Sequence, residues 1–276
     1  MKKTRFGIIG NPISHSLSPV MHNYWFKKYN INAEYELFDI AENEIQNVIT
    51  KIKDKNIKGV NVTLPYKKTV IPYLNKTIND ANETHSVNTL MLDEKENLIG
   101  ENTDVFGFQA GYLKSLSSQE KRNKSVLILG AGGVAPSIIL ALLKSNILDI
   151  TLTNRTYEKS LFLQKNFKSI KVINWSDFSN VLNKFDIIIN ATSLGLKSSD
   201  NFQSDFSNYK KGMVYIDTIY NPSETNMIKY FKSKKIRSYN GLNMFIYQGQ
   251  KAFYLWNKIN PEIDDELLKL LESKLN

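Results

Sequence analysis

The glycine-rich segment at residues 130–135 constrains the fold of this chain more than any other feature. It reads Gly130-Ala131-Gly132-Gly133-Val134-Ala135, between the apolar run 125–129 and a helical pattern at 134–144. Strand, glycine loop and helix in this order form the context that the dinucleotide-binding fingerprint G-x-G-x-x-G/A requires. Gly130 permits the tight turn, Gly132 lets the backbone approach a pyrophosphate, and Ala135 allows close helix–strand packing. The segment therefore predicts a Rossmann-type, doubly wound nucleotide-binding domain.

The end of the following strand distinguishes between two dinucleotides. Residues 150–153 are followed by Asn154-Arg155-Thr156. An NAD site usually places Asp or Glu here, whereas an arginine can pair with a 2′-phosphate through charge-assisted hydrogen bonds. The alternative is an exposed arginine at a strand end. The position of Arg155 after the glycine loop favours NADP as the cofactor.

Apolar, β-branched runs alternate with helical patterns along most of the chain. We expect strands at residues 5–9, 34–38, 59–62, 125–129, 150–153, 171–173, 187–190 and 213–217. We expect helices at residues 44–52, 134–144 and 224–231, and a hairpin formed by 88–92 and 97–100. A further helix should begin with Ser18 as N-cap and Pro19 at its first position. Such alternation predicts parallel α/β sheets.

Two domains are expected within the 276 residues. A second strand–helix series begins near Ser125, after the polar stretch 115–124, and a helix at about 104–116 would connect the two domains. The segment from Asn243 onward is helical and amphipathic, and the sequence alone does not assign it to a domain.

Composition excludes several classes of protein. The chain has no cysteine, which excludes disulfides, thiol catalysis and Cys–zinc sites. No apolar run approaches the roughly 18 residues of a membrane helix, and the N-terminal apolar stretch is too short for a signal peptide. The net charge of +9 is compatible with an anionic partner such as nucleic acid, but the lysines are scattered and no nucleic-acid motif accompanies them. The three histidines lack metal-ligand spacing. We expect a cytoplasmic protein without membrane or nucleic-acid partners or a bound metal.

Polar clusters follow the expected strands of the N-terminal half. They are Ser14-His15-Ser16, Asn61-Val62-Thr63-Leu64-Pro65-Tyr66-Lys67, Val87-Asn88-Thr89 and Glu101-Asn102-Thr103-Asp104. In open α/β sheets such positions face the ligand crevice. Each cluster alone could serve capping or turn formation. Together they supply hydroxyls, amides, one lysine and one carboxylate, which suit a small polyhydroxylated substrate.

These clusters belong to a series of nine motifs, in order and over essentially the whole chain, that resembles the shikimate dehydrogenase family. The motifs are Ser14-x-Ser16-x-Ser18-Pro19, Asn61-Val62-Thr63-Leu64-Pro65-Tyr66-Lys67, Val87-Asn88-Thr89, Asn102-Thr103-Asp104, Gly130-Ala131-Gly132-Gly133, Asn154-Arg155-Thr156, Asn190-Ala191-Thr192-Ser193-x-Gly195, Asp217-x-x-Tyr220-x-Pro222-x-x-Thr225 and Gly241-Leu242-x-Met244-x-x-x-Gln248. The resemblance implies an NADP-dependent oxidoreductase that interconverts 3-dehydroshikimate and shikimate in aromatic amino acid biosynthesis.

The resemblance also implies a domain division and a set of site residues. Residues 1–104 and 241–276 would form an N-terminal α/β substrate-binding and catalytic domain, and residues 105–240 the NADP domain. Lys67 and Asp104 would be the catalytic pair. The implied substrate-binding residues are Ser14, Ser16, Thr63, Lys67, Asn88, Asp104, Tyr220 and Gln248. The implied cofactor-binding residues are Gly130, Ala131, Gly132, Gly133, Val134, Ala135, Asn154, Arg155, Thr156, Thr192, Ser193, Gly241 and Met244.

Reaction chemistry supports the catalytic pair independently. Reduction of a ketone by hydride develops negative charge on oxygen, so a positioned acid must deliver a proton. A lysine can do so, and a nearby carboxylate can orient both the ammonium and a substrate hydroxyl. We further expect the two domains to close on their ligands, with Lys67, Asp104, Thr192 and Gln248 lining the crevice.

Departures from the family pattern leave some questions of specificity open. His85-Ser86 stands where the family usually has Gly-Ala, and Val105 stands where glycine is common, while Leu194 and Pro136 also differ from frequent choices. Two alternatives remain: a quinate/shikimate dehydrogenase with broader substrate and cofactor use, which Arg155 disfavours, and a non-catalytic metabolite-binding relative, which the presence of Lys67 and Asp104 disfavours. Either a monomer or a homodimer is compatible with the sequence.

Overall fold

The chain folds into two compact units. The computed structural model describes residues 2–114, 116–197 and 199–275. The first unit contains Met1–Gly107 and Ile246–Lys274, and the second contains Phe108–Phe245 and the last two residues. The chain passes between the units within α4 (Asp104–Phe108) and again within α9 (Leu242–Asn257). One residue of the polar stretch predicted at 115–124, Ser115, lies outside the described residues, and α5 (Ser118–Arg122) occupies most of the rest.

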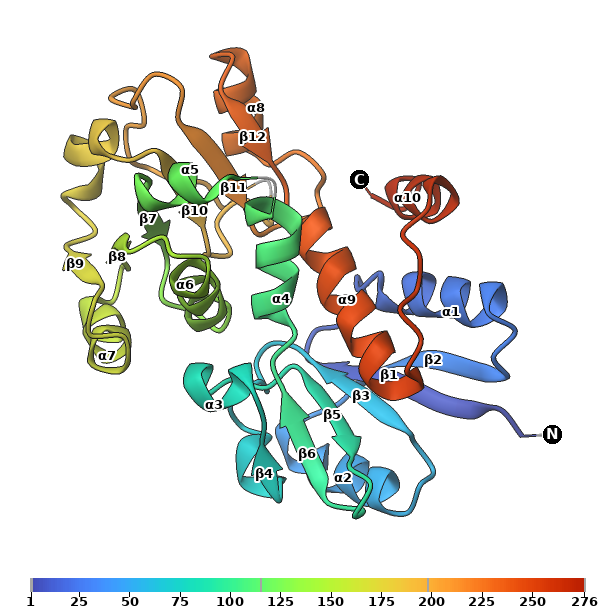
Figure 1. Ribbon diagram of the computed structural model, residues 1–276. Helices are drawn as coiled ribbons and strands as arrows, with labels where there is room; N and C mark the ends of the chain where they lie inside the picture. The colour runs from blue at the N-terminus through green and yellow to red at the C-terminus, as the bar shows by residue number, and fades with distance from the viewer. Residues whose placement is uncertain (1, 115, 198, 276) are drawn as a thin grey trace. The chain divides into compact units, whose positions relative to one another are not determined.

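The first unit is built on a mixed six-stranded sheet with the order β2-β1-β3-β5-β6-β4 (Figure 1). The strands are β1 (Thr4–Gly10), β2 (Ala33–Asp39), β3 (Gly59–Val62), β4 (Lys76–Thr77), β5 (Thr89–Leu92) and β6 (Leu98–Glu101). The helical segments are α1 (Ser18–Lys28), η1 (Glu42–Glu44), α2 (Ile45–Lys53), η2 (Ile71–Tyr73), α3 (Asp80–Thr84) and α10 (Asp265–Glu272). Antiparallel pairing of β5 with β3 and β6 confirms the predicted hairpin.

Opposite faces of this sheet pack against different helices. Ile9 of β1 and the alternate residues Val60 and Val62 of β3 lie in one core cluster with the apolar side of α2. Phe6 faces the other way, with ring centroids 5.0 Å from Phe26 of α1 and 5.3 Å from Trp256 of α9. The alternation follows from the period of two in a β-strand. The carboxyl ends of β1 and β3 are thereby fixed between two packed layers.

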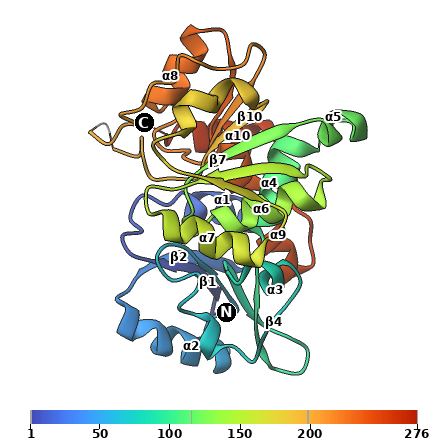
Figure 2. The ribbon, with the colours of Figure 1, turned by 90° about the vertical axis from the view of Figure 1, so that its left-hand side faces the viewer.

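The second unit is a parallel, doubly wound sheet with the order β12-β11-β10-β7-β8-β9. Its strands are β7 (Ser125–Leu129), β8 (Asp149–Thr153), β9 (Lys171–Ile173), β10 (Ile187–Asn190), β11 (Val214–Asp217) and β12 (Arg237–Tyr239). Its other helical segments are η3 (Gln109–Leu113), α6 (Ala135–Lys144), α7 (Tyr157–Asn166), η4 (Phe178–Lys184) and α8 (Asn226–Ser233). Helices α6 and α7 lie on one side of the sheet and α8 on the other (Figures 1 and 2). The predicted fold class, two α/β units of which one is of Rossmann type, is confirmed.

The predicted N-cap of the first helix is wrong. Helix α1 already includes Ser18, and Leu17 is its N-cap residue. The N–H of Ser18 donates to Ser16 Oγ at 3.3 Å, and the Ser16 hydroxyl donates to Ser18 Oγ at 3.1 Å. Ser16 therefore accepts a backbone N–H at the start of the helix, the role that the sequence pattern predicted for Ser18. Pro19 takes the second helical position.

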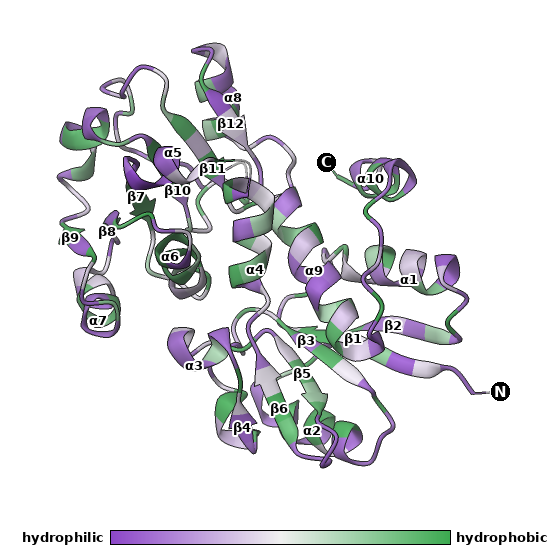
Figure 3. Cartoon of the chain, viewed as in Figure 1, coloured by the Kyte–Doolittle hydropathy of each residue, from purple (hydrophilic) through white to green (hydrophobic). Residues whose placement is uncertain are grey.

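The C-terminal helix α10 is attached to the first unit through its N-cap. Its turns carry both hydrophobic and hydrophilic residues, and Leu267 and Leu271 are buried (Figure 3). Asp264 accepts the N–H of Leu267 at 2.8 Å and the hydroxyl of Tyr24 at 2.7 Å, and it also pairs with Lys28 of α1. Partial burial opposes ionisation of Asp264, but these donors prevail and lower the pKa of its carboxyl to about 2.

We expect Asp264→Asn to weaken the acid dependence of folding stability. A carboxyl whose pKa is lower in the folded state stabilises fully above its ordinary value of 3.8, and this stabilisation is lost as the pH falls towards about 2. Asparagine keeps an N-cap acceptor but removes the charge that pairs with Lys28. Thermal unfolding between pH 4 and pH 2 should therefore show a shallower fall in Tm for the variant, and a lower Tm at pH 7. The neighbouring Asp265→Asn is the control, and an equal change in both variants would contradict the assignment.

Candidate active site

Lys67 and Asp104 form an ion pair within the first unit. Lys67 Nζ lies 2.6 Å from Asp104 Oδ2, and the two side chains are only 12% and 8% exposed. Lys67 lies in the turn after β3, where its carbonyl accepts the N–H of Val87 at 2.8 Å, and Asp104 is the first residue of α4. Largely desolvated charges are tolerated when the partner and further hydrogen bonds satisfy them. The pair therefore requires polar neighbours, and the surrounding loops supply them.

Asn88 donates a second hydrogen bond to the Asp104 carboxylate. Its Nδ2 lies 2.9 Å from Asp104 Oδ1 and 3.4 Å from Gln248 Oε1 of α9, and its Oδ1 accepts the backbone N–H of Thr103 at 2.8 Å. Because a backbone N–H can only donate, the contact with Thr103 determines which end of the amide faces Asp104. Four of the residues predicted to act on substrate, Lys67, Asn88, Asp104 and Gln248, thus lie together.

Asn102 fixes the backbone at the start of α4. Its Oδ1 accepts the N–H of Asp104 at 3.0 Å, and its Nδ2 donates to the Ser86 carbonyl at 2.9 Å. A side-chain amide that accepts the N–H two residues onward is a recognised turn-forming pattern of asparagine. The sequence motif contained Asn102 without giving it a role, and its spacing from Asp104 was the available signal.

Ser14, Ser16 and Thr63 lie in the loops after β1 and β3, which are neighbouring parallel strands. The N–H of Asn11 donates to the Leu64 carbonyl at 3.1 Å and links the two loops. Ser14 is exposed, whereas Ser16 and Thr63 are partly exposed. These three hydroxyls therefore lie in loops at one end of β1 and β3, and Lys67 follows in the loop after β3.

The glycine loop of the second unit has the backbone geometry of a dinucleotide site. Gly130 has a φ of +107°, and a Cβ there would lie 2.7 Å from Thr192 Cγ2, so this position requires glycine. Gly132 is exposed, and the atom nearest to a Cβ there would be Ala191 O at 3.8 Å. Gly133 and Val134 lead into α6, whose first residue, Ala135, is fully buried. The exposed, side-chain-free segment at Gly132 before a helix N-terminus fits a pyrophosphate.

The end of β8 is connected to this loop through Asn154. Its Oδ1 accepts the N–H of Ala131 at 2.9 Å, and its Nδ2 donates to the Thr156 carbonyl at 2.8 Å. Arg155 and Thr156 are both exposed beside this contact. Asn154 therefore holds together the two segments that are predicted to bind the cofactor, and Arg155 is accessible to an anionic group.

Thr192 and Ser193 lie in the loop after β10. The Thr192 hydroxyl donates to Asn190 Oδ1 at 2.7 Å and accepts the N–H of Leu194 at 3.0 Å, so it forms part of the loop structure. Asn190 Nδ2 in turn donates to Asp217 Oδ1 at 3.0 Å. Ser193 is exposed. The Asn190–Asp217 contact joins the ends of β10 and β11 and shapes the loop that holds both predicted cofactor residues.

Asp217 is a buried acid with several donors around it. Burial raises the pKa of its carboxyl above the ordinary value, although hydrogen bonds from Ile219 N–H, Thr225, Asn190 and Tyr215 oppose the shift. The Thr225 hydroxyl lies 2.9 Å from Asp217 Oδ2. Asp217 therefore serves to connect β11 with the start of α8. Its place in the sequence motif alone did not indicate this role.

Gly241, Met244 and Tyr220 lie close to one another at the start of α9. A Cβ on Gly241 would lie 2.2 Å from the Thr218 carbonyl oxygen, so only glycine fits. The Tyr220 ring stacks on Phe245 with centroids 4.6 Å apart, and Met244 is buried. The structure thus places these three predicted site residues within one cluster of the second unit.

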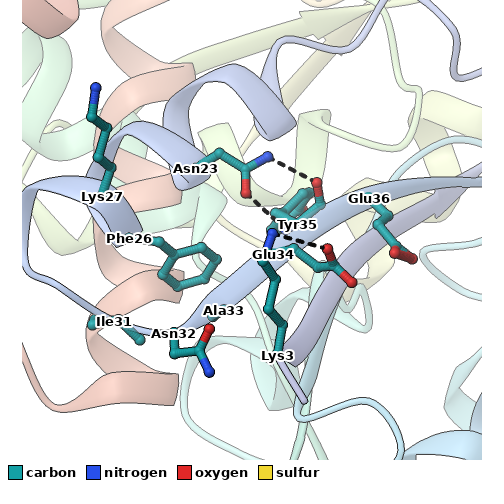
Figure 4. A pocket seen from close by; sticks show the side chains of 10 residues that line it. All are labelled: Lys3, Asn23, Phe26, Lys27, Ile31, Asn32, Ala33, Glu34, Tyr35 and Glu36. Atoms are coloured by element: carbon teal, nitrogen blue, oxygen red, sulfur yellow. Dashed lines mark hydrogen bonds and ion pairs between the residues drawn. The ribbon is translucent and has the colours of Figure 1, made fainter. Parts of the chain in front are cut away.

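A surface depression of about 460 Å³ lies elsewhere, between α1 and the edge strand β2 (Figure 4). Its lining residues are Lys3, Asn23, Phe26, Lys27, Ile31, Asn32, Ala33, Glu34, Tyr35 and Glu36. None of these is a predicted site residue, and the lining offers scattered charges of both signs. Within the described ranges, no group of three or more His, Asp or Glu residues could hold a metal ion. Also within those ranges, no helix has the length and apolar character needed to cross a membrane.

One unit carries a Rossmann-type glycine loop, and the unit joined to it carries a buried Lys–Asp pair amid polar side chains. Together these two features define the class of two-domain α/β dehydrogenases. Comparison with known proteins specifies the family. The model of the shikimate dehydrogenase substrate-binding domain matches residues 8–90, and that of shikimate/quinate 5-dehydrogenase matches residues 113–228. The chain belongs to the shikimate dehydrogenase family.

Individual relatives match over nearly the full length. A shikimate dehydrogenase (NADP(+)) of Pelagibacter ubique is 47% identical over 272 residues, which cover 99% of this chain and 100% of the relative. The crystal structure of shikimate dehydrogenase from Aquifex aeolicus has a TM-score of 0.88 at 36% identity, covering 99% of this chain and 97% of that one. Shikimate 5-dehydrogenase from Thermus thermophilus, solved with NADP(H) and shikimate, has a TM-score of 0.87 at 26% identity, covering 99% and 100%.

Proposed function

We propose that the protein catalyses the reversible NADP-dependent reduction of 3-dehydroshikimate to shikimate, a step in aromatic amino acid biosynthesis. The observation that carries the proposal is the Lys67–Asp104 pair, 2.6 Å apart and held by Asn88, in a chain that belongs to the shikimate dehydrogenase family. Full-length relatives bear the name shikimate dehydrogenase (NADP(+)).

Lys67 is the proposed proton donor. NADPH would supply the hydride, and the ketone oxygen that receives negative charge would take a proton from the Lys67 ammonium. Asp104 holds that ammonium through Oδ2, while Asn88 occupies Oδ1. A carboxylate oxygen has two lone pairs, so Asp104 can still accept a substrate hydroxyl. The same groups act in reverse when shikimate is oxidised.

The proposed substrate contacts form two groups, one for the carboxylate of the substrate and one for its ring hydroxyls. Ser14 and Ser16, in the loop after β1, would donate to the substrate carboxylate. Thr63, Asn88, Asp104 and Gln248 would hold the ring hydroxyls, with Tyr220 as a further contact. Recognition by several neutral donors matches a small polyhydroxylated acid, because each hydroxyl needs a partner once water is excluded.

The proposed cofactor contacts lie in the second unit. The pyrophosphate would lie against Gly130, Ala131, Gly132, Gly133, Val134 and Ala135, and the 2′-phosphate against Asn154, Arg155 and Thr156. Thr192, Ser193, Gly241 and Met244 would surround the nicotinamide. The charge distribution supports an anionic cofactor here: Lys and Arg clearly outnumber Asp and Glu in residues 108–245, whereas the two classes nearly balance in the rest of the chain.

A direct assay tests this proposal. Purified protein with NADP and shikimate should produce NADPH, followed by its absorbance, and quinate should give a much lower rate. Comparable rates with quinate would favour the broader quinate/shikimate dehydrogenase. The absence of turnover with either substrate, together with measurable shikimate binding, would favour the non-catalytic relative. Domain closure, a cytoplasmic location and a monomeric or homodimeric state stay predictions.

A further inference from the structure

Tyr35, a residue outside all of the motifs, is held from three directions in the first unit. It lies on the edge strand β2 and is 3% exposed. Asn23 of α1 binds both of its backbone groups: Oδ1 accepts the Tyr35 N–H at 2.9 Å, and Nδ2 donates to the Tyr35 carbonyl at 3.0 Å (Figure 4). The ring stacks on His22 with centroids 4.4 Å apart and an interplanar angle of 4°. Its hydroxyl is therefore placed with little freedom.

The Tyr35 hydroxyl begins a series of buried hydrogen bonds. It lies 2.7 Å from Asn61 Oδ1 on β3. Asn61 Nδ2 lies 3.1 Å from the Asn88 carbonyl oxygen and 3.1 Å from Thr89 Oγ1. Because a carbonyl oxygen can only accept, the contact with Asn88 determines the orientation of the Asn61 amide. Tyr35 must then donate to Asn61, and Asn61 to Thr89.

The series continues in the same direction to the catalytic carboxylate. Thr89 Oγ1 lies 3.0 Å from Asn88 Oδ1, the amide oxygen that is oriented by the Thr103 N–H. The single Thr89 proton therefore points to Asn88, whose Nδ2 donates to Asp104 Oδ1. Four hydrogen bonds thus form one directed path, from Tyr35 through Asn61, Thr89 and Asn88 to Asp104.

We propose that Tyr35 is a positioning residue for catalysis: through Asn61, Thr89 and Asn88 it orients the Asp104 carboxylate that holds Lys67. The proposal rests on the proposed function, because Asp104 and Lys67 are its catalytic pair. Successive donors that point the same way polarise one another, and the effect is stronger where water is excluded. Asn61 and Thr89 are 4% and 0% exposed, so the path is dry along its length.

The ring that stacks on Tyr35, His22, adds no charge to this path. Burial lowers the pKa of His22 to about 3, so the stacked imidazole is neutral at physiological pH. Neither His22 nitrogen has a hydrogen-bond partner among the described residues, and the Trp25 ring lies 5.5 Å away, centroid to centroid. The hydroxyl of Tyr35 consequently has Asn61 as its oriented acceptor, within apolar and neutral neighbours.

Steady-state kinetics of four proteins test the proposal: the wild type, Tyr35→Phe, Thr89→Val and the double variant. Tyr35→Phe removes one neutral hydrogen bond of the path and Thr89→Val removes two, and each single variant should lower kcat about two- to tenfold. KM for shikimate should remain within about twofold, since the groups that contact substrate are all retained. The double variant should lose less than the product of the two single losses, because the directed path from Tyr35 to Asp104 runs through Thr89.

Tyr66→Phe is the matched control. Tyr66 is also 3% exposed in the first unit, and its hydroxyl donates to the Ile40 carbonyl at 2.7 Å, away from the path. Both Tyr→Phe variants should lose thermal stability, but only Tyr35→Phe should lose kcat. If Tyr35→Phe does not fold, Thr89→Val alone must still lower kcat without raising KM.

Any of four results would overturn the proposal. They are an unchanged kcat in Tyr35→Phe, an unchanged kcat in Thr89→Val, a double variant whose loss is the product of the two single losses, and an equal kcat loss in Tyr66→Phe. Turnover of the wild type, measured in the same assay, shows whether the proposed reaction is wrong or only the proposed role of the hydrogen-bond path. An inactive wild type would refute the proposed reaction, whereas an active wild type beside an unaffected Tyr35→Phe refutes only the path.

Discussion

Lys67→Ala should lower kcat by about 10²–10⁴-fold, the usual contribution of a positioned general acid or base. The ammonium lies 2.6 Å from Asp104 and the Lys67 side chain is 12% exposed, so little bulk water reaches it as an alternative proton donor. KM for shikimate should change far less, because the contact with the reacting oxygen strengthens mainly in the transition state. Steady-state assays with saturating NADP measure both constants.

Lys68→Ala is the internal control for this variant. Lys68 is the adjacent residue but is exposed, so its removal should leave kcat nearly unchanged. If Lys67 only neutralised the pocket, KM would rise and kcat would hold. A near-normal kcat in Lys67→Ala, with the fold intact by circular dichroism, would show that the proposed proton donor is wrong even though the family assignment stands.

Arg155→Ala should reduce kcat/KM for NADP about tenfold or more and leave the value for NAD nearly unchanged. A charge-assisted hydrogen bond contributes roughly 1.5–3 kcal/mol, and only NADP carries the 2′-phosphate that would receive it. Arg155 is exposed next to Asn154, whose contact with Ala131 does not depend on the arginine side chain. The loop should therefore keep its shape in the variant.

The matched control is Arg122→Ala, which removes another exposed arginine of the second unit, on α5. It lowers the positive charge of the unit equally, so it measures any general electrostatic contribution to cofactor binding. Equal losses for NADP and NAD in Arg155→Ala, or equal losses in the two arginine variants, would show that Arg155 does not distinguish the 2′-phosphate.

Strands with a continuous apolar signal were predictable from the sequence, and two polar edge strands were not. The predicted ranges 59–62 and 187–190 coincide with β3 and β10, both buried at every position. Strand β4 has only two residues, Lys76–Thr77, and β12 is Arg237–Tyr239, with no fully buried residue. Their pairing with β6 and β11 is a tertiary event that leaves no hydrophobic pattern in the chain.

Some roles in the candidate site could likewise be predicted from the sequence, and others could not. Lys67 and Asp104 could be selected from the sequence because their motifs and the chemistry of ketone reduction point to them. The orienting role of Asn61 could not, because the direction of its amide depends on a backbone group that lies far away in the sequence. Asn61 is oriented by the carbonyl of Asn88, 27 residues later. Tyr35 gave no signal at all, since a tyrosine that alternates with polar residues in a strand is ordinarily a core residue.

The contact of Asn23 with Tyr35 also affects how readily this sheet edge can pair with another strand. An edge strand presents unpaired N–H and carbonyl groups that can recruit a strand from another chain. At Tyr35 the Asn23 side chain already occupies both groups, as a neighbouring strand would. Glu34 and Glu36 on either side add like charges that would face each other if two such edges paired in antiparallel register about Tyr35. An invading strand would first have to displace Asn23, so the residue proposed to orient the Asp104 carboxylate lies where the sheet edge is protected against strand addition.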